Sequence, residues 1–343
     1  MRLLITADPG LPVPPPLYGG IERVIDGLVR QLVSRGHDVT LLADTLSTSP
    51  ATRRWPWPKT SPHTLLGQIS HMGMLARAVR ECRPDLVHSF SRLWFLLPAL
   101  LAKIPSVMSY QREPTLAAVR RAVRVSRGSL AFSGCSAYIC RQGGRAGGTW
   151  TAIPNGIPLS QYEFRARVSH DAPLLFLSRV ERIKGAHTAI QVARRSGRRL
   201  VIAGNHSETG DEGRYWREVI APEVGRGGVE YIGAVNDEQK NEWLGKAAAL
   251  LVPVEWEEPF GIVFAEALAC GTPVISSPRG ALPEIVRPGI DGFLEGSIEG
   301  LCKAVSEVHT IDRAQCRRRA EEYFSIDVVA DQYEALYRRW IKR

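Results

Sequence analysis

Two glutamates in the second half of the chain, Glu258 and Glu266, are separated by seven residues and flank the start of an expected helix. The turn between them comprises Pro259, Phe260, Gly261 and Ile262. A glycine there lets the backbone approach a ligand closely, and free amides at a helix start hydrogen-bond hydroxyls or phosphate oxygens. Two carboxylates so placed can hold two polyhydroxyl groups of one ligand. The alternative is an acidic first helical turn that the helix dipole stabilises.

Two cations follow the expected strand at residues 174–177: Arg179, and Lys184 directly before Gly185. Proteins with α/β folds bind ligands at the carboxyl ends of their strands. Cations that converge at such a place can neutralise a diphosphate as it leaves. Two solvated surface cations are the alternative interpretation.

A pair of glycines, Gly19 and Gly20, opens the first expected helix within residues 17–22. Such a pair offers free amides without side-chain obstruction, which favours a phosphate contact, although it also marks ordinary turns. A fourth segment, residues 279–284 followed by residues 289–294, indicates only a loop, a helix start and a turn.

Short apolar runs that alternate with helical stretches place these residues on two arrays of strand–helix units, which is typical of parallel sheets. The pattern predicts strands at residues 3–7, 39–43, 85–89, 106–109 and 131–133, and in the second array at 174–177, 200–203, 230–232, 249–252 and 273–276. Pro and Gly at residues 154–158 predict the link between the arrays. Residues 53–63, with two tryptophans and three prolines, are expected to form an ordered loop, near an acceptor or simply on the surface. Residues 328–342 are expected to form an amphipathic helix.

The composition favours two globular domains. The chain has 343 residues, of which 44% are hydrophobic and 23% charged, and a domain usually holds about 100–200 residues. The six cysteines lack Cys-x-x-Cys spacing, which disfavours zinc or a disulfide framework and favours reduced thiols. No signal peptide is expected, and no apolar run reaches the roughly 20 residues that span a bilayer. The expectation is a soluble protein that can still rest on a membrane.

Positive charge is concentrated in the first half. Residues 1–155 carry 19 Lys and Arg against 8 Asp and Glu, whereas the remainder carries 25 against 27. A basic half favours an anionic partner, or is simply an arginine-rich solvated surface. Arg120, Arg124 and Arg127 share one face of an expected helix, which can hold anionic lipid or a lipid-diphosphate acceptor, or be only a solvated basic helix. Aromatic-basic RNA motifs are missing, which disfavours nucleic acid as a partner.

Neither a Gly-x-Gly-x-x-Gly fingerprint nor a Walker loop follows the first strand, which disfavours NAD enzymes and P-loop NTPases. Taken together, the motifs resemble glycosyltransferase family 4, a retaining family with the GT-B fold. The resembling segments are residues 178–185, 201–204, 231–233 and 258–275, the interdomain segment 154–157, and in the first half residues 19–20 and 85–88.

The resemblance implies an α/β fold with two Rossmann-like domains whose parallel sheets face an interdomain cleft. The acceptor-binding domain is expected at residues 1–155, with a C-terminal helix at about 326–343 packed back on it. The nucleotide-sugar domain is expected at residues 156–325.

The resemblance also implies roles for the motif residues. Glu258 would bind hydroxyls of the donor sugar, and Glu266 would bind the ribose of the nucleotide. Arg179 and Lys184 would be the catalytic cations at the diphosphate, and Glu258 would be the third catalytic residue. The backbone of residues 259–262 would contact sugar and phosphate. The family needs no metal or other cofactor, and the chain shows no Asp-x-Asp triplet that would hold a metal.

On the first domain, the resemblance implies that Gly19 and Gly20 close on the diphosphate. The candidate acceptor-side residues are His88, Gln111 and Arg112. One departure matters: the family often has His-x-His after an early strand, with the second His near the reacting sugar, and here Phe90 occupies that place. Either the acceptor side has diverged or these residues recognise an unusual acceptor, and altered or lost activity stays open.

The function implied is metal-independent, retaining transfer of a hexose from a UDP- or GDP-sugar to a hydroxyl of a glycan or lipid-linked acceptor. Such transfer belongs to the assembly of cell-surface polysaccharide, lipopolysaccharide or glycolipid. Two alternatives stay open: a nucleotide-sugar 2-epimerase of GT-B fold, and a non-catalytic protein that binds nucleotide-sugars. The expected location is the cytoplasm or the inner face of the membrane.

Overall fold

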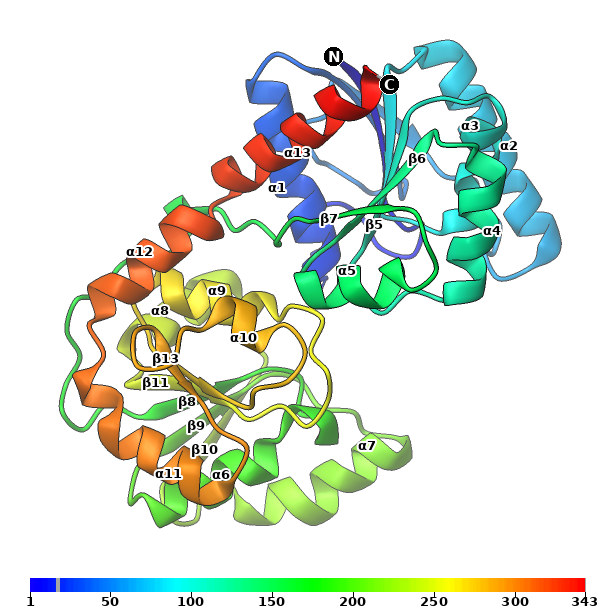
Figure 1. Cartoon of the computed structure of the whole chain (residues 1–343). Coiled ribbons are helices and arrows are strands. Elements are labelled where there is room, and N and C mark those ends of the chain that lie inside the picture. The colour runs from blue at the N-terminus through cyan, green and yellow to red at the C-terminus, as the bar shows by residue number, and fades with distance from the viewer. Residues whose placement is uncertain (17–18, 343) are drawn as a thin grey trace. The chain divides into compact units, whose positions relative to one another are not determined.

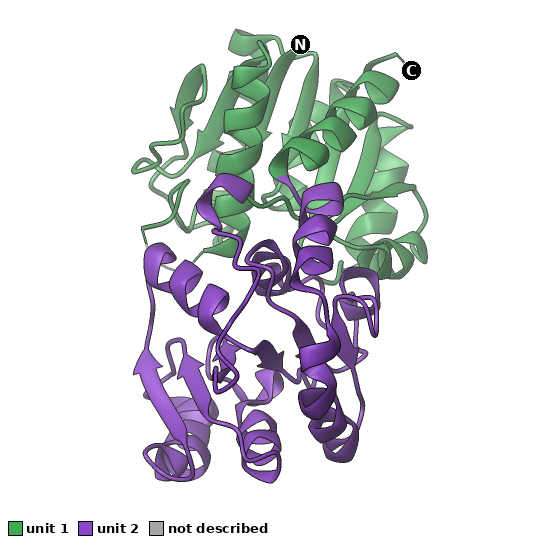
Figure 2. Cartoon of the chain, turned by 90° about the vertical axis from the view of Figure 1, so that its left-hand side faces the viewer, with its two compact units in different colours: residues 1–157, 326–343 green, residues 158–325 purple. Residues whose placement is uncertain are grey.

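The computed structural model describes residues 1–16 and 19–342, which form two compact units. Unit 1 comprises residues 1–157 and the last segment, from Ile326 onwards, whereas unit 2 comprises residues 158–325 (Figure 2). The boundary between the units therefore lies at 157/158, close to the one expected at 155/156. Each unit holds one parallel sheet with helices on both faces (Figure 1).

The sheet of unit 1 has seven strands in the order β3-β2-β1-β4-β5-β6-β7. These are β1 (Arg2–Thr6), β2 (Asp38–Ala43), β3 (Arg53–Pro56), β4 (Leu86–Ser89), β5 (Ser106–Tyr110), β6 (Leu130–Gly134) and β7 (Thr149–Ala152). The central strands are buried on both faces, which explains why their sequences are continuous apolar runs and not alternating ones. In β1, for example, Leu3, Leu4 and Ile5 are all buried.

Helices cover both faces of this sheet (Figure 1). They are α1 (Gly20–Ser34), α2 (Leu65–Cys82), η1 (Leu93–Leu96), α3 (Leu97–Leu101), α4 (Leu116–Ser126), α5 (Ala137–Gly144) and α13 (Ile326–Ile341). Helices α1 and α13 share a core on one face, which contains Ile25, Leu28 and Tyr333. Helices α2, α3 and α4 cover the other face around Leu75 and Phe132. Each such buried side chain contributes about 1.5–3 kcal/mol by leaving water.

The last helix, α13, belongs to unit 1 although it follows unit 2 in the sequence. The amide of Ile326 donates to the carbonyl of Ile157, 2.9 Å away, so the chain leaves and re-enters unit 1 at one place. Side chains of α13, among them Tyr333, Tyr337 and Trp340, are almost completely buried. The helix is therefore a structural component of the first unit.

Strand β3 corrects the expectation of a loop at residues 53–63. Arg53 to Pro56 pair with β2 at the edge of the sheet, and Arg53, Arg54 and Pro56 are exposed. An edge strand tolerates proline and exposed charge because only one of its sides needs hydrogen bonds. The segment therefore lacks the apolar run by which a strand is recognised in sequence.

The sheet of unit 2 has six strands in the order β10-β9-β8-β11-β12-β13. These are β8 (Leu174–Leu177), β9 (Leu200–Ala203), β10 (Val229–Gly233), β11 (Ala249–Val252), β12 (Val274–Ser276) and β13 (Gly292–Leu294). The sequence pattern predicted the first five of them. It missed β13, and β7 in unit 1, because these short strands at sheet edges are partly exposed.

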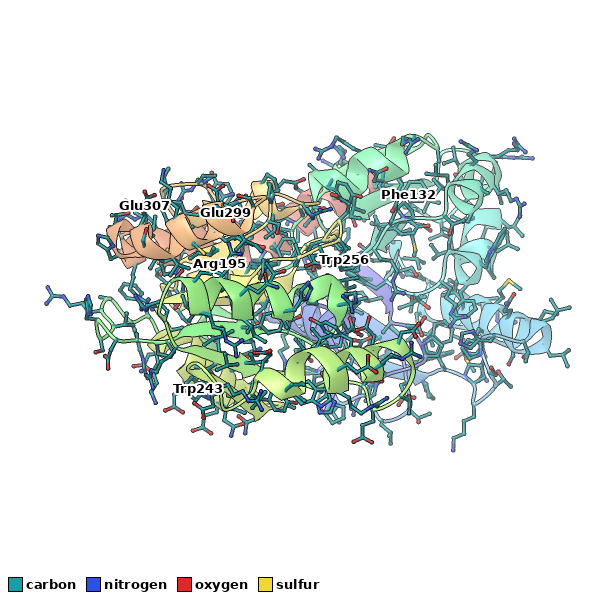
Figure 3. All side chains as sticks on the ribbon, turned by 90° about the horizontal axis from the view of Figure 1, so that it is seen from below. Phe132, Arg195, Trp243, Trp256, Glu299 and Glu307 are labelled. Carbon is teal, nitrogen blue, oxygen red and sulfur yellow. The ribbon has the colours of Figure 1, made fainter. Side chains whose placement is uncertain are left out.

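The helices of unit 2 are η2 (Leu159–Gln161), η3 (Arg182–Lys184), α6 (Ala186–Arg195), α7 (Gly210–Tyr215), η4 (Trp216–Ile220), η5 (Ala221–Glu223), α8 (Asp237–Lys246), α9 (Ile262–Ala269), α10 (Leu282–Ile285), α11 (Ile298–Glu307), η6 (Val308–Thr310) and α12 (Arg313–Tyr323). Helices α6 and α11 lie on one face of the sheet, and α8 and α9 lie on the other (Figure 1). Arg195 of α6 and Glu299 of α11 form an ion pair of 2.9 Å (Figure 3). Both side chains are exposed, so this pair contributes little to stability.

Among the residues that the structure describes, no helix combines the length and the apolar character needed to cross a bilayer.

Candidate active site

The loops after β8 and β11 begin side by side at the carboxyl edge of unit 2. Strand β8 continues through α6 to β9 on one side, whereas β11 continues through α9 to β12 on the other side. Such a reversal of strand order opens a crevice between the two loops, and α/β sheets bind ligands there. The predicted donor-binding residues of the second half lie in these loops and in the helix that follows β11.

Lys184 and Glu258 meet at this point. The Lys184 Nζ lies 2.6 Å from Oε2 of Glu258, and the two side chains are only 13% and 8% exposed. Trp256 completes the cluster: its indole N–H donates to the same Glu258 oxygen at 3.0 Å, and its ring lies 4.7 Å from the Lys184 ammonium. The carboxylate is thus held by a charge and a hydrogen bond, and the ammonium has a cation–π neighbour.

A glycine makes this meeting possible. Gly185 ends η3 with a φ of +77°, in the left-handed region that favours glycine. A Cβ atom at Gly185 would lie 2.1 Å from the carbonyl oxygen of Pro253, just after β11. Any other residue would push the two loops apart, which explains why glycine follows Lys184.

Arg179 occupies a different environment from that of Lys184. It lies two residues after β8, its side chain is 41% exposed, and it forms an ion pair with Glu181. The two predicted phosphate-binding cations therefore differ, since Lys184 is buried in its ion pair and Arg179 reaches solvent.

The turn that enters α9 is shaped to expose backbone groups. Gly261 precedes α9 with a φ of +79°, and as a glycine it has no side chain that could cap the helix. A Cβ atom at Gly261 would lie 2.5 Å from the ring of Phe264. Phe260 is 3% exposed and packs 5.8 Å from the ring of Phe324. Because its ring is buried, Phe260 can offer a ligand only its backbone, and contact of this turn with sugar and phosphate stays a prediction.

The segment that follows β12 forms hydrogen bonds to the residues just before this turn. The amide of Gly280 donates to Oε2 of Glu257 at 2.7 Å, and the amide of Ala281 donates to the carbonyl of Glu258 at 2.8 Å. The sequence indicated only a loop and a helix start at residues 279–284. In the structure this segment fixes the backbone that carries Glu258.

Glu266 is almost buried and has two partners that the sequence did not indicate. Its Oε1 accepts from the Tyr162 hydroxyl at 2.7 Å and from Lys240 at 2.6 Å. Lys240 also lies 3.3 Å from Asp237. Burial lowers the pKa of Lys240, but the charge of Glu266 and the hydrogen bonds outweigh it, so the pKa is raised. Burial, and then the charge of Glu266, raises the pKa of Tyr162 well above its usual value.

A cavity of about 410 Å³ opens beside the loop after β11. Its wall includes Thr188, Glu255, Arg279 and Glu295. Lys184 and Glu258 do not line this cavity.

In unit 1, the structure places His88 in the core. His88 is completely buried; Nδ1 lies 2.6 Å from the Tyr337 hydroxyl, and Nε2 lies 2.6 Å from the Ser109 hydroxyl. Burial lowers the pKa of His88 to about 3, so the imidazole stays neutral. His88 therefore joins β4 to β5 and to α13, and a role for it on the acceptor side stays a prediction.

Phe90 is also a core residue. It is 7% exposed, and its ring lies 4.3 Å from the ring of His88 and 6.3 Å from the ring of Tyr333. The residue that stands in place of the second family histidine therefore extends the packing around His88.

The other acceptor candidates lie at the carboxyl end of β5. Gln111 is half-buried, and its buried Nε2 has no hydrogen-bond partner among the described residues. Arg112 is exposed. Burial raises the pKa of Glu22 in α1, and the positive charge of Arg112 offsets only part of this rise. Gln111 and Arg112 thus offer hydrogen-bond donors at this edge of the sheet.

The glycine pair lies at the start of α1. Gly19 precedes the helix without a side-chain cap, and a Cβ atom there would lie 2.7 Å from the ring of Pro15. The helix begins at Gly20. Leu17 and Tyr18, which belong to the same predicted motif, lie outside the described residues.

Comparison with known proteins identifies glycosyltransferases along the chain. The protein-family model described as "Glycosyltransferase Family 4" matches residues 18–161, and the family model described as "Glycosyl transferases group 1" matches residues 163–323. Glycogen synthase of Mycobacterium tuberculosis is 28% identical, with 90% of this chain and 86% of that protein covered. D-inositol 3-phosphate glycosyltransferase of Mycobacterium avium is 30% identical over 49% of this chain and 42% of that protein.

Solved structures give the same result over the full length. AviGT4, a glycosyltransferase involved in avilamycin A biosynthesis, is 25% identical with a TM-score of 0.74, and 99% of this chain and 98% of that chain are covered. Anabaena HepE in complex with UDP is 17% identical with a TM-score of 0.80, and 99% of this chain and 100% of that chain are covered. HepE supports the fold alone, and AviGT4 adds sequence similarity. The two sheets and these matches together show that the chain is a glycosyltransferase with the GT-B fold, a member of the group 1 and family 4 glycosyltransferases.

Proposed function

We propose that this chain transfers a hexose, with retention of configuration, from a UDP- or GDP-sugar to a hydroxyl of a glycan or lipid-linked acceptor. The observation that carries the proposal is the buried Lys184–Glu258 pair, held between the loops after β8 and β11. HepE has been solved with UDP, with UDP and glucose, and with UDP-glucose, which supports a nucleotide-sugar as donor. The reaction would serve the assembly of cell-surface polysaccharide, lipopolysaccharide or glycolipid.

In this proposal, different charged residues of unit 2 bind different parts of the donor. Lys184 exchanges Glu258 for the diphosphate oxygens, and Arg179, which is partly exposed to solvent, adds a second positive charge. Glu258 then accepts hydrogen bonds from hydroxyls of the sugar, and Glu266 accepts them from the ribose. The backbone of residues 259–262 contacts sugar and phosphate.

Cleavage of the sugar–phosphate bond places negative charge on the departing diphosphate. Two protein cations and the amides at the start of α9 stabilise that charge, so we propose a reaction without a metal. The acceptor hydroxyl attacks from the face that the diphosphate leaves, and the diphosphate takes its proton. A phosphate contact from Gly19 and Gly20 stays a prediction.

The proposal places the protein in the cytoplasm, at the source of nucleotide-sugars. All six cysteines are free thiols in the structure, which fits a reducing compartment.

A panel of nucleotide-sugars tests the proposal directly. UDP-glucose or another UDP- or GDP-sugar is expected to raise the melting temperature, because ligand at about 100 times its Kd adds about 2.7 kcal/mol of stability. The donor that binds is then incubated with candidate acceptors, and the products are identified. A glycosylated acceptor supports transfer, whereas an epimerised free sugar indicates an epimerase. If no nucleotide-sugar shifts the melting temperature, the proposal fails.

Trp256 is expected to hold the Glu258 carboxylate when Lys184 turns to the diphosphate. Trp256→Phe keeps an aromatic ring beside the ammonium but removes the indole N–H. We expect the KM for the donor to rise about tenfold, since a hydrogen bond to a charged group contributes roughly 1.5 kcal/mol. The matched control is Trp243→Phe, a half-buried tryptophan of α8 (Figure 3). An equal rise of KM in both variants would show that Trp256 has no special role.

A further inference from the structure

The cavity of about 410 Å³ that opens beside the loop after β11 contains none of the proposed donor-binding residues. All of its lining residues belong to unit 2, and they come from the starts of α6 and α11 and from the loops after β11, β12 and β13. Its volume falls within the range of about 300–1,000 Å³ that small-molecule sites have in proteins. The polar residues of its wall are Thr188, Glu255, Ser277, Arg279, Glu295 and Ser297.

Glu255 of this wall is oriented by two residues of α6. Its Oε1 lies 3.0 Å from Nε2 of His187 and accepts from the Thr188 hydroxyl at 3.0 Å. Its amide donates to the carbonyl of Ile183 at 2.8 Å, which fixes the backbone. No described residue donates a hydrogen bond to the second carboxylate oxygen, Oε2. This oxygen can therefore accept from a ligand in the cavity.

The hydroxyl of Tyr215 determines which nitrogen of His187 carries the ring proton. It accepts from the amide of His187 at 3.2 Å and lies 2.9 Å from Nδ1. Burial raises the pKa of Tyr215 to about 12, so the hydroxyl keeps its proton and donates a hydrogen bond to Nδ1. Nε2 therefore carries the proton and donates to Glu255. A neutral histidine is sufficient to hold the carboxylate in place.

Ser277, which follows β12, adds a hydroxyl to the wall. The residue is 9% exposed, and its hydroxyl has no hydrogen-bond partner among the described residues. Leaving a nearly buried hydroxyl unpaired is unfavourable, and a polar ligand in the cavity would pair it. Ser277 and Glu255 thus offer the cavity two hydrogen-bonding groups that the described part of the protein leaves unused.

The start of α11, on another side of the cavity, is already satisfied. A Cβ atom at Gly300 would lie 2.5 Å from Oε2 of Glu295, so this carboxylate lies beside the first turn of the helix. The Ser297 hydroxyl accepts from the Gly300 amide at 3.1 Å and caps the helix. The positive end of the helix dipole therefore has a carboxylate and a cap of its own, and it gives the cavity no preference for an anion.

The charges of the wall favour a neutral ligand that is rich in hydroxyl groups. Two carboxylates, Glu255 and Glu295, disfavour an anion, and the guanidinium of Arg279 disfavours an organic cation. Among the described residues, no three His, Cys, Asp or Glu side chains are grouped so that they could hold a metal ion. Sugar hydroxyls can donate to the carboxylates and accept from the guanidinium. The apolar residues Pro278 and Ile298 of the wall can pack against the carbons of a sugar ring.

The cavity lies next to the loop that carries the proposed donor-sugar carboxylate. Glu255 and Glu258 belong to this loop and are three residues apart. The amide of Gly280, directly after Arg279, donates to Oε2 of Glu257 in the same loop at 2.7 Å. A sugar in the cavity would therefore be bound beside the proposed site of transfer.

We propose that this cavity binds a neutral sugar unit of the acceptor glycan, with Glu255 and Ser277 as its hydrogen-bonding residues. The identification of this sugar as part of the acceptor rests on the proposed function. Saccharide binding does not, since it can be measured without turnover.

Isothermal titration calorimetry of the whole chain with neutral oligosaccharides tests the proposal. The probes are maltotriose, lactose, mannobiose and chitobiose, and at least one of them is expected to bind. Glu255→Gln keeps an oxygen for His187 and Thr188 but removes the charge, so it is expected to weaken saccharide binding about tenfold. Ser277→Ala removes a hydroxyl without a described partner, so the fold is kept and binding is expected to weaken about threefold to tenfold.

The matched control is Glu307→Gln, which is expected to bind saccharide as the unaltered chain does. The Glu307 side chain is 45% exposed, against 40% for Glu255. It lies at the last residue of α11, away from the cavity residues at the start of this helix and away from Trp256 (Figure 3). In a transfer assay, Glu255→Gln is expected to raise the KM for the acceptor about tenfold and to leave kcat and the KM for the donor unchanged.

Three results would overturn the proposal. The first is that none of the four probes binds to the unaltered chain. The second is that Glu255→Gln and Ser277→Ala bind saccharide no more weakly than Glu307→Gln does. The third is a loss of saccharide binding in Glu258→Gln but not in Glu255→Gln, which would place the saccharide in the donor site.

The thermal shift with nucleotide-sugars reports on the proposed function separately. If a saccharide binds through Glu255 but no nucleotide-sugar raises the melting temperature, the transferase proposal fails and the cavity remains a saccharide site. If nucleotide-sugars bind and no saccharide does, the transferase proposal stands and the cavity has no part in it.

Discussion

Replacing Lys184 by alanine is expected to lower kcat about 10²–10³-fold, the usual effect of removing one group that stabilises charge in a transition state. In the structure Lys184 is the buried cation at the point where the loops after β8 and β11 meet. If it exchanges Glu258 for the departing diphosphate, its loss raises the barrier of the chemical step. Release of the nucleoside diphosphate from the best donor and acceptor is the measurement.

The control must separate chemistry from folding. Removing one partner of a buried ion pair leaves the other charge uncompensated, which costs up to about 3–5 kcal/mol. The double variant Lys184→Ala, Glu258→Gln removes that charge, so it restores the melting temperature but not turnover. Lys246→Ala is the matched control, since Lys246 is half-exposed and pairs with Glu242 on the surface of the same unit. Unchanged kcat in Lys184→Ala would remove Lys184 from the mechanism.

The second large effect is a loss of stability in unit 1 between pH 7 and pH 5, caused by His88. The folded pKa of His88 is about 3, whereas the unfolded pKa is about 6.5. Between these values the unfolded chain binds a proton that the folded chain does not, so stability is complete above about pH 6.5 and falls as the pH falls. At pH 5, about 1.5 pH units below the unfolded pKa, the loss is about 2 kcal/mol.

The variant His88→Gln isolates this effect, because an amide can hydrogen-bond but does not titrate near neutral pH. It is expected to be less stable than the unaltered chain at pH 7 and to lose about 2 kcal/mol less between pH 7 and pH 5. Denaturant unfolding at the two pH values measures both quantities. His63→Gln is the control, since His63 is exposed. A pH dependence in His88→Gln equal to that of the unaltered chain would contradict the assignment.

The sequence predicts those features of the site that local rules determine. Continuous apolar runs reveal β8 and β11, and a glycine directly after Lys184 or before Ile262 marks a backbone that must pass close to another group. These residues lie within a few positions of their strands. Local pattern therefore places them at the right edge of the right sheet.

The pairing of side chains depends on strand order, which the sequence pattern does not contain. Lys184 and Glu258 are 74 residues apart and meet because β8 and β11 are neighbours. Tyr162 and Lys240 reach Glu266 from a loop and from α8, and no motif marks them. His88 shows the converse: a histidine inside a family motif is held by Tyr337 from the far end of the chain and serves the core.

The return of α13 to unit 1 determines the order in which the protein can complete itself on the ribosome. Synthesis normally lets an N-terminal domain fold first, at about 5–20 residues per second. Here the core that α1 shares with Tyr333, Tyr337 and Trp340 stays uncovered until residues 158–325 have been made, which takes roughly ten to thirty seconds. Unit 2 is one uninterrupted stretch of the chain and can complete its fold first. A nascent chain thus carries a finished unit 2 and an unfinished unit 1, and a premature stop after residue 325 would damage the earlier half of the protein and not the later one.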